Sequence, residues 1–305
     1  MQIGFKTGPK NWDEGKQIVT EDGAKLCEVW FRIDKKDEYT DMLAWLQAQN
    51  VAIGLHHWGL IEGKYKTNLG SSHPTIRQKT IQQIKDTIDV GAALKNCAYV
   101  NAHCPAQGTE EVSFEQSTQI LSKDYWSDIP TMEKLFFEAA AELFAYAKDK
   151  GVLLTIETLI GREPAGRQED RTKCYDAGDM NFKTLLRLQD YAGYLANDIT
   201  HTGSQICIET SDREEMWQQL LAFTQEAASI TRLVHVNTLV EPFNGTDSHN
   251  GLLAEDWMAG AWPSREQVKE LLALFKDRND VLVIPEPKDK MRENYAALVA
   301  LVKEI

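Results

Sequence analysis

The sequence contains no long hydrophobic run. None of its apolar stretches approaches the ~20 residues that a membrane-spanning helix needs. Residues 1–6 lead directly into a strand-like segment, without the apolar stretch of a secretory signal peptide. The sequence therefore predicts a protein with no membrane partner.

Cysteine is scarce and poorly arranged for cross-linking. The chain has five cysteines, an odd number, which are widely spaced and include no Cys-x-x-Cys pair. Neither a disulfide framework nor a thiolate zinc site is expected from such spacing. Unpaired cysteines suit a reducing compartment, so the predicted location is the cytoplasm.

Positive charge is also in short supply. Lys and Arg total 33 against 46 Asp and Glu, which gives a formal net charge of −13. Such a surface repels a phosphate backbone, and no Lys/Arg-rich stretch with interleaved aromatic residues offsets it. We therefore expect a small-molecule substrate and no nucleic-acid partner. The sequence leaves open whether copies of the chain form a homo-oligomer.

Short β-branched or apolar runs alternate with longer segments of helical period along most of the chain. The expected strands are residues 3–6, 26–32, 51–57, 99–104, 152–158, 205–210, 232–238 and 281–287. The expected helices are residues 37–49, 75–94, 132–150, 182–197, 214–229, 264–277 and 292–303. Residues 11–23 are expected to form a loop with one short helix. Eight strand-helix repeats predict a single parallel (β/α)₈ TIM barrel that spans residues 1–305.

The connections between these elements are unequal in length. Helix-to-strand links are two or three residues long, whereas the strand-to-helix links at residues 58–74, 105–131, 159–180 and 239–263 are long. Long loops in a compact domain are usually functional, and the chemistry of a TIM barrel lies on the face formed by its strand-to-helix loops. The sequence thus indicates which face of the barrel carries the site.

Ionisable residues stand at the ends of four consecutive expected strands: Glu157, Glu209, His235 and Glu286. Such residues are costly to bury without partners, and each one alone is more simply explained as a hydrogen-bonded residue of the barrel. Four of them in register favour a shared site, because three carboxylates can lie together ionised only beside a cation. Carboxylates with one imidazole suit Mn²⁺, Mg²⁺, Co²⁺ or Zn²⁺.

Further polar and aromatic residues lie at neighbouring positions. The third expected strand ends in His56-His57-Trp58, and the fourth contains His103. The loop after the seventh expected strand contains an Asp247-Ser-His249 motif. That motif can ligate a metal or bind substrate hydroxyl groups, but the same composition also forms an Asx-capped turn.

These motifs resemble the xylose-isomerase-like TIM-barrel superfamily, which contains sugar isomerases and epimerases of the tagatose-epimerase type and the endonuclease IV repair enzymes. Glu157-Thr158 resembles the Glu-Asn-Thr motif of its fifth strand, and His235-Val-Asn237 resembles the His-x-Asn-Asp motif of its seventh. Glu209-Thr-Ser-Asp212 is matched to the sixth-strand motif Asp-Thr-x-His, with Glu in place of Asp and Asp in place of His. Glu286 is matched to the Glu of the last strand.

The resemblance implies a role for each matched residue. Glu157, Glu209, His235 and Glu286 would hold the divalent metal, and Glu157 and Glu286 would also exchange the substrate proton. The positions at which the endonuclease branch keeps additional zinc ligands are matched by His57 or His56, His103, Asp212, Asp247 and His249. We expect the substrate to contact His57, Trp58, His103, Asp212, Asp247 and His249, with the indole ring stacking on the substrate.

The leading hypothesis is therefore a divalent-metal-dependent isomerase or epimerase of a sugar or polyol-like substrate. It would act by proton transfer through an enediolate, which needs a base beside the reacting carbon and a stabiliser for the developing charge. Two alternatives remain at this point. One is a zinc-dependent, endonuclease IV-like phosphodiesterase, and the other is a related lyase or dehydratase, or a barrel that only binds.

Overall fold

Parallel strands form the centre of the computed structural model, which describes residues 1–113, 118–122, 125–164, 166–167 and 171–305. Within these residues the central sheet has the order β1-β16-β15-β14-β10-β7-β4-β3-β2, and every neighbouring pair is parallel. Its strands are β1 (Gln2–Ile3), β2 (Phe5–Thr7), β3 (Leu26–Arg32), β4 (Ala52–Trp58), β7 (Cys97–His103), β10 (Leu154–Glu157), β14 (Tyr194–Asp198), β15 (Thr231–Val236) and β16 (Leu282–Pro285).

The sheet closes on itself at the first strand. Residues 2–3 pair with β16 and residues 5–7 pair with β3, so one interrupted strand joins the two edges of the sheet. The interruption is Gly4, where an added Cβ would lie 2.6 Å from Leu26 Cγ and 2.7 Å from Ile284 Cδ1. Only a residue without a side chain lets the strand pass this close to both neighbours. The predicted (β/α)₈ barrel is confirmed.

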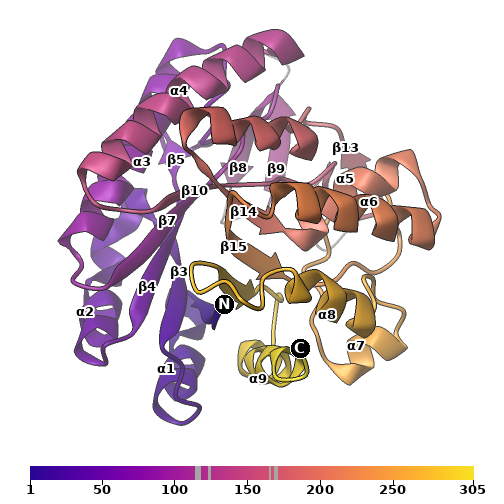
Figure 1. Ribbon diagram of the computed structural model, residues 1–305. Helices are drawn as coiled ribbons and strands as arrows, with labels where there is room; N and C mark the ends of the chain where they lie inside the picture. The colour runs from indigo at the N-terminus through magenta and orange to yellow at the C-terminus, as the bar shows by residue number, and fades with distance from the viewer. Residues whose placement is uncertain (114–117, 123–124, 165, 168–170) are drawn as a thin grey trace.

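Helices surround the sheet, with α3 and α4 on one side and α6 and α8 on the other (Figure 1). The helical elements are η1 (Pro9–Asn11), α1 (Trp12–Thr20), η2 (Ile33–Tyr39), α2 (Thr40–Ala48), α3 (Pro74–Ala93), α4 (Ile129–Asp149), η3 (Phe182–Tyr191), α5 (Ile199–Glu209), α6 (Arg213–Ala227), α7 (Ala254–Met258), α8 (Arg265–Ala273) and α9 (Met291–Val302). In α4, Asp128 accepts a hydrogen bond from the Thr131 amide and so caps the first turn, while residues such as Phe136 and Leu143 are buried toward the sheet. Among the described residues, no helix is long and apolar enough to cross a membrane.

Long loops after β4, β7 and β10 join to form a second sheet at the mouth of the barrel. This five-stranded sheet has the order β12-β9-β8-β6-β5 and is antiparallel wherever its strands pair. Its strands are β5 (Leu60–Ile61), β6 (Tyr65–Lys66), β8 (Thr109–Ser113), β9 (Thr118–Ser122) and β12 (Gly166–Arg167), and β11 (Glu163–Pro164) pairs separately with β13 (Cys174–Tyr175). The face of the barrel that loop length predicted to carry the site is thus covered by this second sheet.

The structure corrects the prediction around the sixth strand. The expected helix at 182–197 ends at Tyr191, where Ala192 adopts a left-handed conformation with φ of 52°. The chain then forms β14, and the expected strand at 205–210 is the second half of α5. Asp198 starts this helix by accepting hydrogen bonds from the amides of Thr200 and His201. Most other expected elements agree with the structure to within a few residues, and residues 12–20 form a full helix.

We expect a Gly54→Ala substitution to destabilise the barrel by about 3 kcal/mol, the upper end of the usual cost of overpacking a core. A methyl group at this position would overlap the ring of Tyr99, which is fully buried on the adjacent strand. Gly8→Ala is the matched control, because its nearest atom, Trp30 Cβ, would lie 3.8 Å from the new methyl group. Urea denaturation of both variants measures the difference, and equal unfolding free energies would contradict the packing argument.

Candidate metal centre

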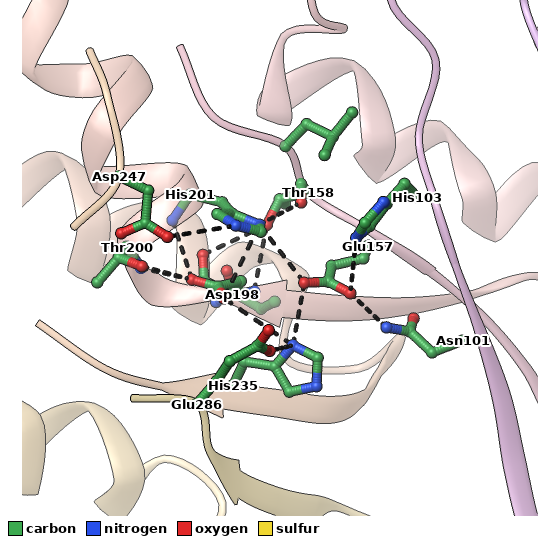
Figure 2. A network of polar contacts seen from close by, with 12 residues as sticks. Asn101, His103, Glu157, Thr158, Asp198, Thr200, His201, His235, Asp247 and Glu286 are labelled. Carbon is green, nitrogen blue, oxygen red and sulfur yellow. Dashed lines mark hydrogen bonds and ion pairs between the residues drawn. The ribbon is translucent and has the colours of Figure 1, made fainter. Parts of the chain in front are cut away.

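Acidic and imidazole side chains from successive strands meet at the carboxyl end of the barrel (Figure 2). Within the described part of the chain they form four groups whose possible ligand atoms lie within 4.8 Å of one another. These groups are Glu157, Asp198, His235 and Glu286; His56, His103 and Glu157; His201, Asp247 and His249; and Glu28, His56, His235 and Glu286. Because the strands are parallel, each delivers its last inward-facing residue to the same place.

The first group is centred on His235 Nδ1. This nitrogen lies 3.0 Å from Glu157 Oε1, 3.0 Å from Glu286 Oε2 and 3.9 Å from Asp198 Oδ2. Burial alone would lower the pKa of His235, but Glu28, Glu157 and Glu286 raise it well above its usual value. Three carboxylates that converge on one buried imidazole form a site of strong negative potential, as a divalent cation requires.

Each carboxylate of this group has one oxygen held by the protein and the other directed to the centre. Lys6 Nζ donates to Glu286 Oε1, Asn101 Nδ2 donates to Glu157 Oε2, and the first turn of α5 donates to Asp198 Oδ1. The remaining oxygens Asp198 Oδ2 and Glu286 Oε2 are buried and accept no hydrogen bond from any residue that the structure describes. Unsatisfied buried oxygens are costly, and a cation at the centre would satisfy both. The residues therefore fit a divalent metal.

Glu28 lies behind His235 and fixes its orientation. His235 Nε2 donates to Glu28 Oε2 over 3.0 Å, and Tyr99 Oη donates to the same oxygen over 2.7 Å. With Nε2 committed, the ring presents Nδ1 to the three carboxylates, an arrangement typical of metal-binding histidines. Lys6 Nζ lies 3.2 Å from Glu28 Oε1 and 2.8 Å from His56 Nδ1, so its ammonium group already supplies a positive charge to the fourth group.

Two smaller groups adjoin the first. His56 Nε2 lies 3.0 Å from His103 Nε2 and 3.4 Å from Glu157 Oε2, so Glu157 has one oxygen in each of two groups. Asp247 Oδ2 lies 3.5 Å from His201 Nε2 and 3.1 Å from His249 Nε2, and among the described residues it has no hydrogen-bond donor. Up to three metal ions can therefore be placed on residues that are already grouped.

The backbone directly after β10 orients the ring of His201. Its Nδ1 donates to the carbonyl of Thr158 over 2.7 Å, which leaves Nε2 directed toward Asp247. Burial would lower the pKa of His201, but Asp198, Glu157 and Asp247 together raise it to about 9. Without a metal this ring is therefore protonated at neutral pH.

The structure brings most of the predicted site residues together. Glu157, His235 and Glu286 form the first group, and His103, Asp247 and His249 lie in the two groups beside it. Trp58 lies at the edge of the centre, with its ring centroid 6.1 Å from that of His103.

Three predicted residues lie elsewhere. Glu209 is the exposed last residue of α5, and Asp212 caps α6 by accepting hydrogen bonds from the amides of Glu214 and Glu215. Their expected positions at a strand end were wrong, because the sixth strand ends eleven residues earlier at Asp198. His57 points away from the barrel axis, and its Nδ1 lies 2.8 Å from Thr87 Oγ1 on α3.

Lys6, Glu28, Asp198 and His201 were not predicted from the sequence, and His56 was predicted only as an alternative to His57. For two of them the sequence contains a signal: Asp198-Ile-Thr-His201 has the Asp-x-x-His spacing of the sixth-strand motif, which was matched instead to residues 209–212. It went unused because residues up to 197 were assigned to a helix. Lys6 and Glu28 were detectable as charged residues inside apolar strands.

Comparisons with known proteins identify the family of the chain. The model of the family described as "Xylose isomerase-like TIM barrel" matches residues 17–173, just over half of the 305-residue chain. The chain belongs to this family. No curated protein matches it in sequence.

Solved structures of sugar epimerases share the fold. L-ribulose 3-epimerase superimposes with a TM-score of 0.65 at 13% identity, covering 100% of this chain and 95% of its own. D-allulose 3-epimerase from Methylomonas sp., in complex with D-allulose, gives 0.65 at 13% identity over 100% and 96%. The 3-keto-D-glucoside 4-epimerase from E. coli gives 0.62 at 14% identity over 99% of both chains. At such low identity the likeness shows the common fold alone.

We expect Asp198→Asn to lower the affinity for a divalent metal by about 100-fold or more, because it removes the charge of an oxygen that faces the centre. Glu209→Gln should leave the affinity unchanged, since this residue is exposed at the end of α5. Metal content after dialysis, measured by plasma mass spectrometry for both variants, provides the comparison. Metal loss in Glu209→Gln alone would reverse the assignment.

Metal binding should strengthen with pH up to about 9, the pKa of His201 without metal. A metal binds neutral imidazole, so below that pH a proton must first be displaced, and affinity falls by up to tenfold per pH unit for this residue. An unperturbed imidazole would level off near pH 6.5. Chelator competition between pH 6 and 9.5 measures the profile. His201→Asn should make the rise between pH 7 and 9 less steep but not abolish it, because the pKa of His235 is also raised. A wild-type plateau at pH 7 would contradict the prediction.

Proposed function

We propose that the protein is a divalent-metal-dependent isomerase or epimerase of a sugar or polyol-like substrate, acting by proton transfer through an enediolate. One observation carries this proposal. Glu157 and Glu286 converge on His235 Nδ1 at 3.0 Å each, at the mouth of a barrel whose structural neighbours are sugar epimerases. Within the described part of the chain, Glu286 Oε2 accepts no hydrogen bond.

The metal and the two carboxylates have separate tasks. A divalent cation held by Glu157, Asp198, His235 and Glu286 supplies positive charge next to the oxygens of the substrate. The two glutamates remove and return the proton on the carbon beside the carbonyl. Lys6 holds Glu286 Oε1, and Glu286 Oε2 faces the centre.

Both glutamates are in the form that this task requires. Burial raises the pKa of each, but Lys6, His235 and His249 bring that of Glu286 down to about 2. For Glu157, His235 and His56 bring the pKa well below its ordinary value. Both side chains are therefore ionised at neutral pH and start the reaction as proton acceptors.

The substrate would lie against the residues at the rim of the centre. His103, Asp247 and His249 offer polar groups to hydroxyls, and Trp58 offers a ring face beside His103. This set retains four of the six substrate contacts expected from the sequence.

A zinc phosphodiesterase is the second candidate, and a specific observation favours it. The three adjoining groups provide nine different residues, and Glu157, which belongs to two of them, would contribute to both sites if each held an ion. Two-metal and three-metal sites are characteristic of phosphoryl-transfer enzymes. The net charge of −13 disfavours a nucleic-acid substrate, so we rank this candidate second.

The proposal predicts that metal-loaded protein carries solvent deuterium into the carbon beside the carbonyl of a reactive ketose. Glu286→Gln should reduce this exchange by about 100-fold or more, because an amide cannot accept the proton. Mass spectrometry of the recovered sugar measures the exchange, and metal content is determined on the same samples. Glu209→Gln is the control that should exchange at the wild-type rate.

Each other outcome has a definite reading. If metal-replete Glu286→Gln exchanges at the wild-type rate, Glu286 is a ligand only and the proton-transfer assignment is wrong. If no ketose exchanges while protein with two or three zinc ions hydrolyses a phosphodiester, the second candidate replaces the first. Loss of water from the sugar would indicate the related lyase or dehydratase.

A further inference from the structure

A buried ion cluster lies on the inner side of the five-stranded sheet at the barrel mouth. Lys66 Nζ on β6 lies 2.7 Å from Glu110 Oε2 on β8 and 2.7 Å from Glu163 Oε1 on β11. Tyr175 Oη donates to Glu110 Oε1 over 3.0 Å. The side chains of Lys66, Glu110 and Glu163 are 11%, 2% and 8% exposed, so this is an enclosed arrangement and not a surface salt bridge.

The cluster has an excess of negative charge. One ammonium group faces two carboxylates at ion-pair distance, and Asp179 lies near enough to interact electrostatically with all three side chains. Burial raises the pKa of Asp179, and none of the described residues donates a hydrogen bond to its two carboxylate oxygens. Even with Asp179 neutral, Lys66 has no net positive charge to offer to an anionic ligand.

Lys66 and Glu110 face a small cavity that reaches the metal centre. His103 lines the same cavity, together with Asn68 and Leu159. His103 Nε2 is also 3.7 Å from Glu157 Oε2, so a molecule bound at the metal centre has one end beside this cavity. The free volume of the cavity is about 10 Å³, enough for one water-sized group.

We propose that this cavity binds a terminal hydroxyl of the substrate and thereby selects neutral sugars against sugar phosphates. The inference rests on the proposed function, because it concerns the far end of the same substrate. An ammonium group has three N–H donors, and among the described residues Glu110 and Glu163 accept two of them. Glu110 Oε1 already accepts hydrogen bonds from Tyr175 and Gln119. The third donor of Lys66 and the second lone pair of Glu110 Oε2 can therefore bind one hydroxyl, which acts as acceptor to Lys66 and as donor to Glu110.

A terminal phosphate meets two obstacles at this position. Its oxygens do not fit a space for one water-sized group, and its charge meets Glu110 and Glu163 with Lys66 already neutralised. Recognition of an anion would need a cation with unpaired charge, as in a typical phosphate site. The small volume of the cavity and the charge of its lining therefore each exclude sugar phosphates independently.

The test compares three ligands on metal-loaded protein by calorimetric titration: D-ribulose, 5-deoxy-D-ribulose and D-ribulose 5-phosphate. We expect the neutral ketose to bind at least about tenfold more tightly than the other two, as loss of a hydrogen bond to charged groups predicts. Equal or tighter binding of the phosphate or the deoxy sugar overturns the proposal. No measurable binding of the neutral ketose overturns it as well.

Two neighbouring glutamates on β8 supply a matched pair of variants. Glu110→Gln keeps the shape of the side chain but removes its charge, so it should weaken D-ribulose binding by about tenfold. It should also reduce the ratio of the affinity for D-ribulose to the affinity for D-ribulose 5-phosphate. Glu111→Gln, on the opposite face of the strand, pairs only with exposed Lys64 in the described structure and should change neither value. If Glu110→Gln does not fold in a thermal melt, the three-ligand comparison on wild-type protein still decides.

Deuterium exchange measured on the same sugars separates this proposal from the proposed function. Preferred binding of the neutral ketose with no exchange on any sugar supports the hydroxyl site but refutes the isomerase. Exchange on both the neutral ketose and its phosphate at equal rates supports the isomerase but refutes the hydroxyl site.

Discussion

The structure depends on the need to neutralise buried carboxylates at the carboxyl end of the barrel. Glu28, Glu157 and Asp198 are fully buried, and Glu286 lies beside them. Lys6 neutralises part of this charge from inside the protein. The rest is left to the protonated histidines in the metal-free protein, or to metal ions that displace those protons.

The neighbourhood of these carboxylates is organised around the same requirement. For Glu157, Asp198 and Glu286, one oxygen is fixed by an amide, a helix N-terminus or an ammonium group, and the other remains for the centre. Because the fixed oxygens cannot rotate away, the geometry exists before a metal binds, and little rearrangement is needed on binding. A rigid first set of ligands held by a second set of partners is the usual basis of metal affinity and specificity.

Much of the fold and part of the site could be predicted from the sequence, because parallel strands place their last residues together. The prediction of the sixth strand was wrong for a physical reason. Helix α5 is buried on all sides from Ile199 to Cys207, so its apolar residues show no helical period. Its segment Gln205-Ile-Cys-Ile therefore resembles a strand. β14, in contrast, ends in the polar residues Asn197 and Asp198 and resembles the end of a helix.

The choice between His56 and His57 could not be made from sequence either. A parallel strand buried on both faces gives no alternation of polar and apolar residues, so nothing indicates which histidine faces inward. Lys66 and its carboxylate partners were unpredictable for another reason. They come from three loops that meet only because the loops pair as a second sheet, and such pairing leaves little trace in short strands.

The split first strand has a consequence for how the site is assembled. Lys6 lies two residues after Gly4, the glycine at which the barrel closes, and its partner Glu286 is 280 residues away along the chain. Contacts between residues so far apart in the sequence form only when the chain between them has closed into a loop. Closing a long loop costs conformational entropy, so such contacts form slowly. A chain that has folded only its first six or seven repeats therefore has most of the candidate ligands in place. It lacks the contact between Lys6 and Glu286, the residue of the last strand. Metal binding at this centre would then require the closed barrel, in which the first and last strands have paired.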